Sequence, residues 1–129
     1  MEHRPAETTH WQPAGEEHFT GQVWFGPMRP ALEGDDLNVL GVAFEPGART
    51  DWHHHPGGQT LYVASGAGFV RNSRGETVAI AAGDVVVASP GEVHWHGAAP
   101  DSPMMHLSIT EGGPTEWLPR KVTDADYDG

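Results

Sequence analysis

Three consecutive histidines are the first residues of this chain whose type and spacing indicate chemistry. Alternate residues of a β-strand share one face, so His53 and His55 are expected to point one way and His54 the other. A Pro-Gly-Gly turn at 56–58 reverses the chain and brings Gln59 back beside the pair. Two imidazole nitrogens and one amide oxygen therefore converge, and such atoms bind divalent metals.

A second group of histidines follows the turn formed by Ser89, Pro90 and Gly91. His94 begins a short strand there, and if the sheet curls into a barrel it completes a set of three histidines and one glutamine. Three neutral nitrogens and a neutral oxygen suit Mn, Fe, Co, Ni or Zn. His96 shares the face of His94, so it is a candidate for lining the cavity. The sequence thus predicts one divalent metal ion per chain.

Short β-type runs separated by turn residues must position these side chains. The 17 glycines and 11 prolines argue against a helix bundle, and no long stretch has helical periodicity. The pattern predicts an all-β sandwich or barrel. The expected strands are 21–27, 37–47, 59–66, 68–71, 76–80, 84–88, 93–96 and 104–110.

The length of 129 residues predicts one domain. We expect residues 1–19 to form an N-terminal arm, either flexible or exchanged with a partner. Residues 20–112 then form the barrel, and 113–129 form a C-terminal tail. One further strand is possible at 115–119, and the acidic end of the tail either forms one helical turn or stays loose.

Composition excludes several classes of site and partner. The absence of cysteine excludes disulfides, zinc–thiolate sites and cysteine nucleophiles. A net charge of −11 argues against binding nucleic acid or an anionic membrane. No apolar run reaches the ~20 residues that span a bilayer, and the N-terminus has no apolar signal stretch. We expect a soluble, cytoplasmic protein that binds a small molecule and, from its Trp-rich outer positions, forms a homodimer or homotetramer.

The two histidine groups resemble the paired motifs of small single-domain cupins, which fold as a double-stranded β-helix, or jelly-roll barrel. The first family motif is G-x5-H-x-H-x3,4-E-x6-G, and Gln59 stands here in place of the usual Glu. The second is G-x5-P-x-G-x2-H-x3-N, in which Ser89 and Ala98 replace the Pro and the Asn. The positions that match both motifs are Gly47, His53, His55, Gly66, Gly83, Gly91 and His94.

The blocks PGARTDWHHHPGGQTLYVASG, PGEVHWHGAAP and MMHL are similar to the manganese-dependent bacterial cupin hydroxynitrile lyases. This resemblance implies that Mn, with Fe, Ni, Co or Zn as alternatives, is bound. It implies proton transfer by His106, and it places Thr50 just before the histidine pair. Thr110 stands where some members carry Gln. The implied metal ligands are His53, His55, Gln59 and His94.

The glutamine at the ligand position has a physical consequence for the reaction. Replacing Glu by Gln removes one negative charge, which makes the metal a stronger Lewis acid and disfavours oxidation of iron. Both effects favour Lewis-acid chemistry over oxygen activation, and the resemblance to the hydroxynitrile lyases implies a lyase that cleaves cyanohydrins to an aldehyde and HCN. Substrate contacts are expected from Thr50, Val42, Leu40, His96 and Thr110.

Three alternatives remain open at this stage. The first is an iron cupin dioxygenase that uses O2. The second is a cupin that binds a metal or small molecule without catalysis. In the third, the lyase activity is incidental and the natural substrate is a bulkier polyketide-like or lactone intermediate.

Overall fold

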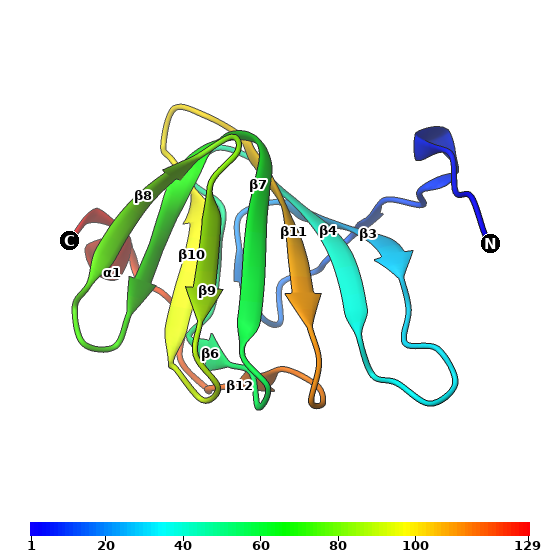
Figure 1. The fold of residues 1–129 in the computed structure, drawn as a ribbon. Coiled ribbons are helices and arrows are strands. Elements are labelled where there is room, and N and C mark those ends of the chain that lie inside the picture. Colours follow the sequence, from blue (N-terminus) through cyan, green and yellow to red (C-terminus); the bar gives the residue numbers. More distant parts are fainter.

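The structure, a computed structural model of residues 1–129, consists of antiparallel strands in one strongly curled sheet (Figure 1). The all-β prediction is confirmed, and the curl produces a half-barrel. The hydrogen-bonded order is β1-β3-β4-β11-β7-β10-β5-β2. In chain order the elements are η1 (Ala6–Thr8), β1 (Gln12–Pro13), β2 (Phe19–Thr20), β3 (Val23–Arg29), β4 (Asn38–Phe44), β5 (Arg49–Thr50), β6 (His53–His54), β7 (Gln59–Asn72), β8 (Thr77–Ala81), β9 (Val85–Ala88), β10 (His94–Ala98), β11 (Met104–Thr110), β12 (Glu116–Trp117) and α1 (Asp124–Asp128).

Strand β7 joins the two halves of the sheet. The sequence predicted two neighbouring strands, 59–66 and 68–71, and this prediction is wrong because one strand runs through both. Its first half pairs with β11 and β9, and its second half pairs with β10 and β8. Gly66 and Gly68 allow this passage, since a Cβ at either position would collide with a backbone carbonyl oxygen of an adjoining segment.

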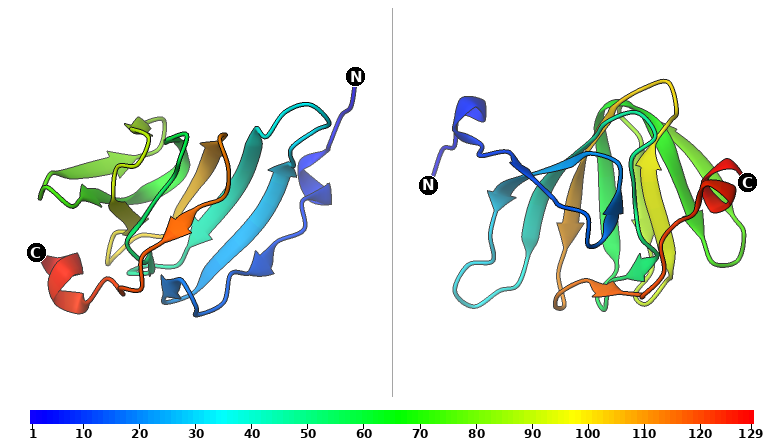
Figure 2. Two further views of the ribbon diagram at one scale, coloured as in Figure 1. Left: turned by 90° about the horizontal axis from the view of Figure 1, so that it is seen from below. Right: turned by 180° about the vertical axis from the view of Figure 1, so that it is seen from behind.

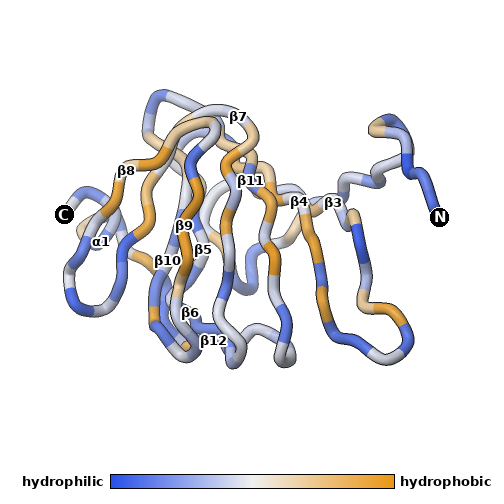
Figure 3. The backbone as a smooth tube through the Cα atoms, in the orientation of Figure 1, coloured by the Kyte–Doolittle hydropathy of each residue, from blue (hydrophilic) through white to orange (hydrophobic).

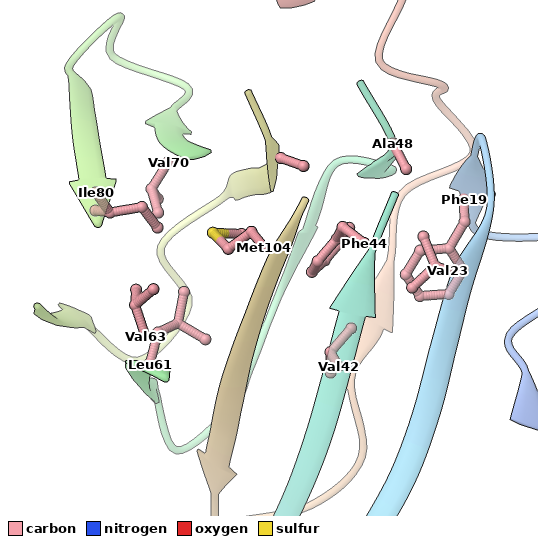
Figure 4. Packing of buried hydrophobic residues seen from close by; sticks show 11 residues of the cluster. Phe19, Val23, Val42, Phe44, Ala48, Leu61, Val63, Val70, Ile80 and Met104 are labelled. Carbon is pink, nitrogen blue, oxygen red and sulfur yellow. The ribbon is translucent and has the colours of Figure 1, made fainter. Parts of the chain in front are cut away.

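The main hydrophobic core lies inside the curl of the sheet (Figure 4). Strand alternation supplies it: in β7, Leu61 and Val63 are fully buried while Tyr62 between them is exposed. Each such buried side chain contributes about 1.5–3 kcal/mol relative to an exposed one. The members of the core are Phe19, Val23, Val42, Phe44, Ala48, Leu61, Val63, Val70, Ile80, Ala98 and Met104.

The N-terminal segment follows the edge of the half-barrel. Strand β1 pairs with β3, and β2 pairs with β5. Trp11 packs above Gly26 and Gly41, which face each other across β3 and β4. The first residues then project away from the sheet (Figures 1 and 2).

The C-terminal segment crosses the other end of the half-barrel (Figure 2). Strand β12 pairs with β6, so part of the expected strand at 115–119 is present. The tail ends in the helical alternative, α1, whose N-terminus is capped by Thr123 and Asp126 in a reciprocal capping box. This segment also completes a second small core, formed by Trp52, Trp95 and Val122.

Hydropathy alternates along the central strands and is low at the chain ends and several loops (Figure 3). In β7 the buried residues of this alternation include the apolar Leu61 and Val63, whereas in β11 the buried residues include the polar His106 and Ser108. None of the helices has the length and apolar character needed to cross a membrane.

Candidate metal centre and pocket

Strands β6 and β10 bring the two histidine groups together. His53 lies directly opposite His94 in the antiparallel register, and their ring centroids are 4.5 Å apart. The ring of His55 lies 5.1 Å from that of His53. His54 points the other way, with its Nε2 3.2 Å from the Glu116 carboxylate. The expected alternation of the three consecutive histidines is therefore confirmed.

Backbone carbonyls fix the orientation of two of these rings. Nδ1–H of His53 donates to the Asp51 carbonyl over 2.8 Å, and Nδ1–H of His94 donates to the Glu92 carbonyl over 2.8 Å. A neutral imidazole carries one N–H, so the Nε2 of each ring keeps a free lone pair. A metal-binding histidine is oriented in the same way, by a hydrogen bond from its other ring nitrogen.

Gln59 and His94 meet in a way that favours a cation. The Gln59 side-chain oxygen lies 2.9 Å from Nε2 of His94, and the Gln59 amide nitrogen donates to Oγ of Ser108 over 2.7 Å. Two atoms that each carry a lone pair thus face each other without a proton between them. A bound cation removes this conflict, so the residues present fit a divalent metal.

His55 and His96 add two more nitrogens without partners. Nδ1 of His55 is 3.4 Å from Oγ1 of Thr115, and its buried Nε2 makes no hydrogen bond. Nε2 of His96 is likewise buried without a partner. The tightest cluster consists of His53, His94 and His96, whose ligand nitrogens all lie within 4.8 Å of one another. Three buried histidines are thus close enough to hold a metal ion, and sequence reasoning had given His96 only a cavity-lining role.

Burial keeps the histidines of this cluster neutral. Burial lowers the pKa of His53 and of His96 well below the usual 6.5, and neighbouring histidines lower both further. The pKa of His55 falls to about 4 for the same two reasons. Burial also lowers the pKa of His94. Neutral imidazoles are ligands and proton acceptors, so the cluster suits metal binding and base chemistry.

His106 lies behind His96 and does not line the pocket. It is fully buried on β11, and its Nε2 is 3.0 Å from Nδ1 of His96. The ring of Phe44 packs 5.3 Å from the His106 ring. Burial lowers the pKa of His106 to about 4. His96 therefore separates His106 from the space that a substrate would occupy.

A pocket with about 370 Å³ of empty volume opens beside the histidines. Of the five expected substrate contacts, Leu40, Val42, Thr50 and His96 line it. Thr110 does not: it lies at the end of β11, opposite Gln59, and borders a separate hollow on the outer side. The remaining lining residues are Phe19, Phe25, His53, His55, Gln59, Ser108, Thr115 and Trp117.

Sequence reasoning missed the aromatic part of this pocket. Phe19 and Phe25 meet edge to face at 5.4 Å, and Phe19 meets Trp117 at 5.6 Å. Trp117 also packs 4.8 Å from His53 and stacks on His18 at 4.3 Å. These rings come from both ends of the chain. Alternation within the expected strand 21–27 could have identified Phe25, because it places this ring on the inward face.

The chain is similar in sequence to known proteins. The Cupin_2 family model, described as a cupin domain, matches residues 41–110. The chain is 47% identical over 112 residues to the (R)-mandelonitrile lyase of Granulicella tundricola, covering 84% of this chain and 85% of that one.

Solved structures share the fold. A cupin-like protein from Thermotoga maritima superposes with a TM-score of 0.82 at 41% identity, covering 89% of each chain. A polyketide cyclase from Streptomyces resistomycificus superposes with a TM-score of 0.77, covering 99% of this chain and 91% of that one. At 15% identity, the second similarity shows the fold alone.

Proposed function

Because the chain belongs to the Cupin_2 family of cupin domains, we propose that it is a metal-dependent lyase that cleaves cyanohydrins to an aldehyde and HCN. The observation that carries this proposal is the cluster of buried, neutral imidazoles beside one amide oxygen at the wall of a largely apolar pocket. The 47% identity to a relative named (R)-mandelonitrile lyase supports the choice of reaction.

The proposed metal ligands are His53, His55, Gln59 and His94. Support comes from the lone-pair conflict between Gln59 and His94, and from the buried His55 nitrogen without a partner. Mn is the first candidate, with Fe, Ni, Co and Zn as alternatives. When bound, such a cation stabilises negative charge on the substrate oxygen as a Lewis acid. His96 is assigned a different role because its Nδ1 is hydrogen-bonded to Nε2 of His106, and a proton can move between these two nitrogens.

His96 and His106 form the proposed acid–base pair. When Nδ1–H of His96 donates to Nε2 of His106, Nε2 of His96 has a free lone pair in the pocket. It accepts the hydroxyl proton of the cyanohydrin as the carbonyl forms and the bond to cyanide breaks. Cyanide leaves with the bonding electrons and takes up the proton that His96 accepted, which gives HCN and restores the neutral imidazole. His106 shares the positive charge, because its Nε2 can accept the proton from Nδ1 of His96.

The pocket wall determines which substrates fit. Leu40 and Val42 offer apolar surface to the substrate side chain, and Phe25 and Trp117 extend this surface with aromatic rings. The Thr50 hydroxyl donates to the Asp51 carbonyl and accepts from the His96 backbone N–H, which holds that strand at the pocket. Thr110 remains a proposed contact only for a substrate group that extends past Gln59 to the outer hollow.

The test is benzaldehyde release from mandelonitrile by manganese-loaded protein without oxygen. We expect His96→Ala and His106→Ala each to lower turnover by about 10²–10⁴-fold, the usual contribution of acid–base catalysis. His54→Ala is the matched control, because His54 belongs to the same run but points away from the pocket. It should leave turnover unchanged.

The dioxygenase and the non-catalytic alternatives predict different outcomes. No turnover by a sample shown to contain metal would overturn the lyase proposal. Turnover that requires iron and consumes oxygen would identify a dioxygenase. Metal-dependent stability without turnover on any substrate would identify a binding module. Full turnover with both the His96 and His106 variants would keep the lyase but remove the acid–base pair.

We also propose that the protein forms a homodimer or homotetramer. Support comes from neighbouring apolar side chains on the outer face of the sheet: Tyr62, Val85 and Val87 are 42%, 60% and 69% exposed. They carry no charge although the chain carries −11, so two copies can bury this face together. Light scattering should give a multiple of the chain mass, and Val87→Glu should lower it.

A further inference from the structure

Ser108 is the one partner that the amide nitrogen of Gln59 has in this structure. We propose that Ser108 is a positioning residue, whose hydroxyl turns the side-chain oxygen of Gln59 toward the metal. This inference rests on the proposed metal centre, and it assigns a role to a residue for which neither the sequence motifs nor the expected substrate contacts gave one.

Each polar atom of the Gln59 amide has a defined neighbour. Gln59 is 5% exposed and Ser108 is 8% exposed, so water does not compete freely for either group. Ser108 faces Leu61 across β11 and β7, which makes it a diagonal neighbour of Gln59 on the adjacent strand. The amide N–H donates to Oγ of Ser108 over 2.7 Å, and the amide oxygen then faces Nε2 of His94 at 2.9 Å.

An amide needs this positioning in a way that a carboxylate does not. A glutamate at this position has two equivalent oxygens, so either can face the cation. A glutamine has one oxygen and one NH2 group, and turning the amide over presents N–H donors, which cannot bind a cation. When the oxygen faces the cation, the Ser108 hydroxyl accepts from the NH2 group and so stabilises that orientation. Without it, a buried N–H lacks a partner whenever the oxygen faces the metal.

The test compares Ser108→Thr with Ser108→Val. These two side chains have nearly the same shape and add the same bulk, and they differ in the hydroxyl alone. We would measure the affinity for Mn²⁺ by competition with a chelator. Ser108→Val should bind Mn²⁺ about 10-fold more weakly, the usual effect of losing a group that orients a ligand. Ser108→Thr should bind close to the parent value.

A spectroscopic measurement separates orientation from packing. With Co²⁺ in place of Mn²⁺, the visible absorption bands report the ligands, so we expect Ser108→Val to shift them and Ser108→Thr to retain them. Thermal unfolding of the metal-free proteins controls for folding. Ser108→Ala, which adds no bulk, serves as a second variant without the hydroxyl if valine destabilises the fold.

The outcomes separate this inference from the metal centre on which it rests. An equal loss of affinity in the Thr and Val variants would show a packing role and overturn the positioning role. Unchanged affinity and spectra in the Val and Ala variants would also overturn it while leaving the metal centre intact. If the parent protein itself bound neither Mn²⁺ nor Co²⁺, the proposed metal centre would fail and this inference with it.

Discussion

The inner and outer faces of strands β6 and β10 carry different kinds of side chain, and this difference explains the site. On the inner face, His53, His94 and His96 gather ring nitrogens within 4.8 Å of one another. On the outer face, Trp52 and Trp95 alternate with those histidines and pack into the second small core. The inner face gathers imidazole nitrogens at the pocket, and the outer face carries two large indole rings.

The C-terminal segment stabilises the outer face. Arg120 lies 4.8 Å above the Trp52 ring, and Tyr127 packs 5.8 Å from the Trp95 ring. The Tyr127 hydroxyl donates to the Ala98 carbonyl at the end of β10. Unpaired buried nitrogens are unfavourable for folding, and packing on the outer face adds to the main core in offsetting that loss. The reactive face is therefore supported from behind by residues 120–127, which supply none of its histidines.

The largest expected effect is on the inner face. We expect His94→Ala to abolish Mn²⁺ retention through gel filtration, because it removes the nitrogen that faces both Gln59 and His53. Lyase turnover should fall to that of the metal-free protein. Metal analysis of the folded fraction checks this result, and a variant that retained one metal ion per chain would contradict the proposed ligand set.

The outer face should respond in stability rather than in chemistry. We expect Trp95→Ala to lower the free energy of unfolding by about 3–5 kcal/mol, the usual loss for a buried aromatic side chain, since Trp95 is 1% exposed. Urea denaturation measures this change. The folded fraction should still bind one metal ion per chain. Loss of metal from protein that remains fully folded would show that the two faces are not separable.

Acidification tests the neutral state of the inner face in metal-free protein. Burial lowers the pKa of His106 from 6.5 to about 4, so between these values the unfolded chain binds a proton that the folded chain does not. The contribution of the neutral His106 to the free energy of unfolding is then fully present above pH 6.5 and is lost as the pH falls toward 4. This shift corresponds to about 3 kcal/mol.

His106→Phe provides the control for this pH effect. It removes the titrating group and keeps a ring, so the pH dependence of the urea midpoint should become shallower in the variant. If the urea midpoint changed equally with pH in the parent and the variant, His106 would not be buried in its neutral form.

The smallest effect is expected at the surface of the outer face. Asp124 pairs with Arg49 over 2.8 Å, but its side chain is 93% exposed. We expect Asp124→Asn to change the free energy of unfolding by less than about 1 kcal/mol. Arg49→Met should destabilise more, because the buried guanidinium also donates to the Val122 carbonyl. Equal effects in urea denaturation would contradict this difference.

The fold class and the proposed ligand positions could be predicted from the sequence because both depend on local periodicity. The alternation around His54 and the turn before Gln59 each involve few residues, and the single-domain cupin fold implied by the resemblance to the family motifs is confirmed. Strand β7 was predicted as two pieces because the glycines inside it resemble turn residues. Only the tertiary structure shows that they make room for neighbouring backbone.

Relations between distant elements could not be predicted from the sequence. The alternation of side chains along β11 places His106 on the inward face, but it does not reveal that His96 lies between His106 and the pocket. Trp117 and Phe19 belong to segments expected to lie outside the barrel, and they meet only when both ends of the chain pack over β6. Thr110 lies on the same face of β11 as Ser108, but this end of the strand extends beyond the pocket.

The continuous course of β7 also determines where this chain can tolerate extra residues. The strand carries Gln59 at its start and pairs through Asn72 with His94 at its end. One residue inserted between these points would turn one group of side chains to the opposite face. The turn after Asn72 has no such constraint, because its added residues would extend into solvent. A peptide tag or reporter inserted there would leave both histidine groups in register.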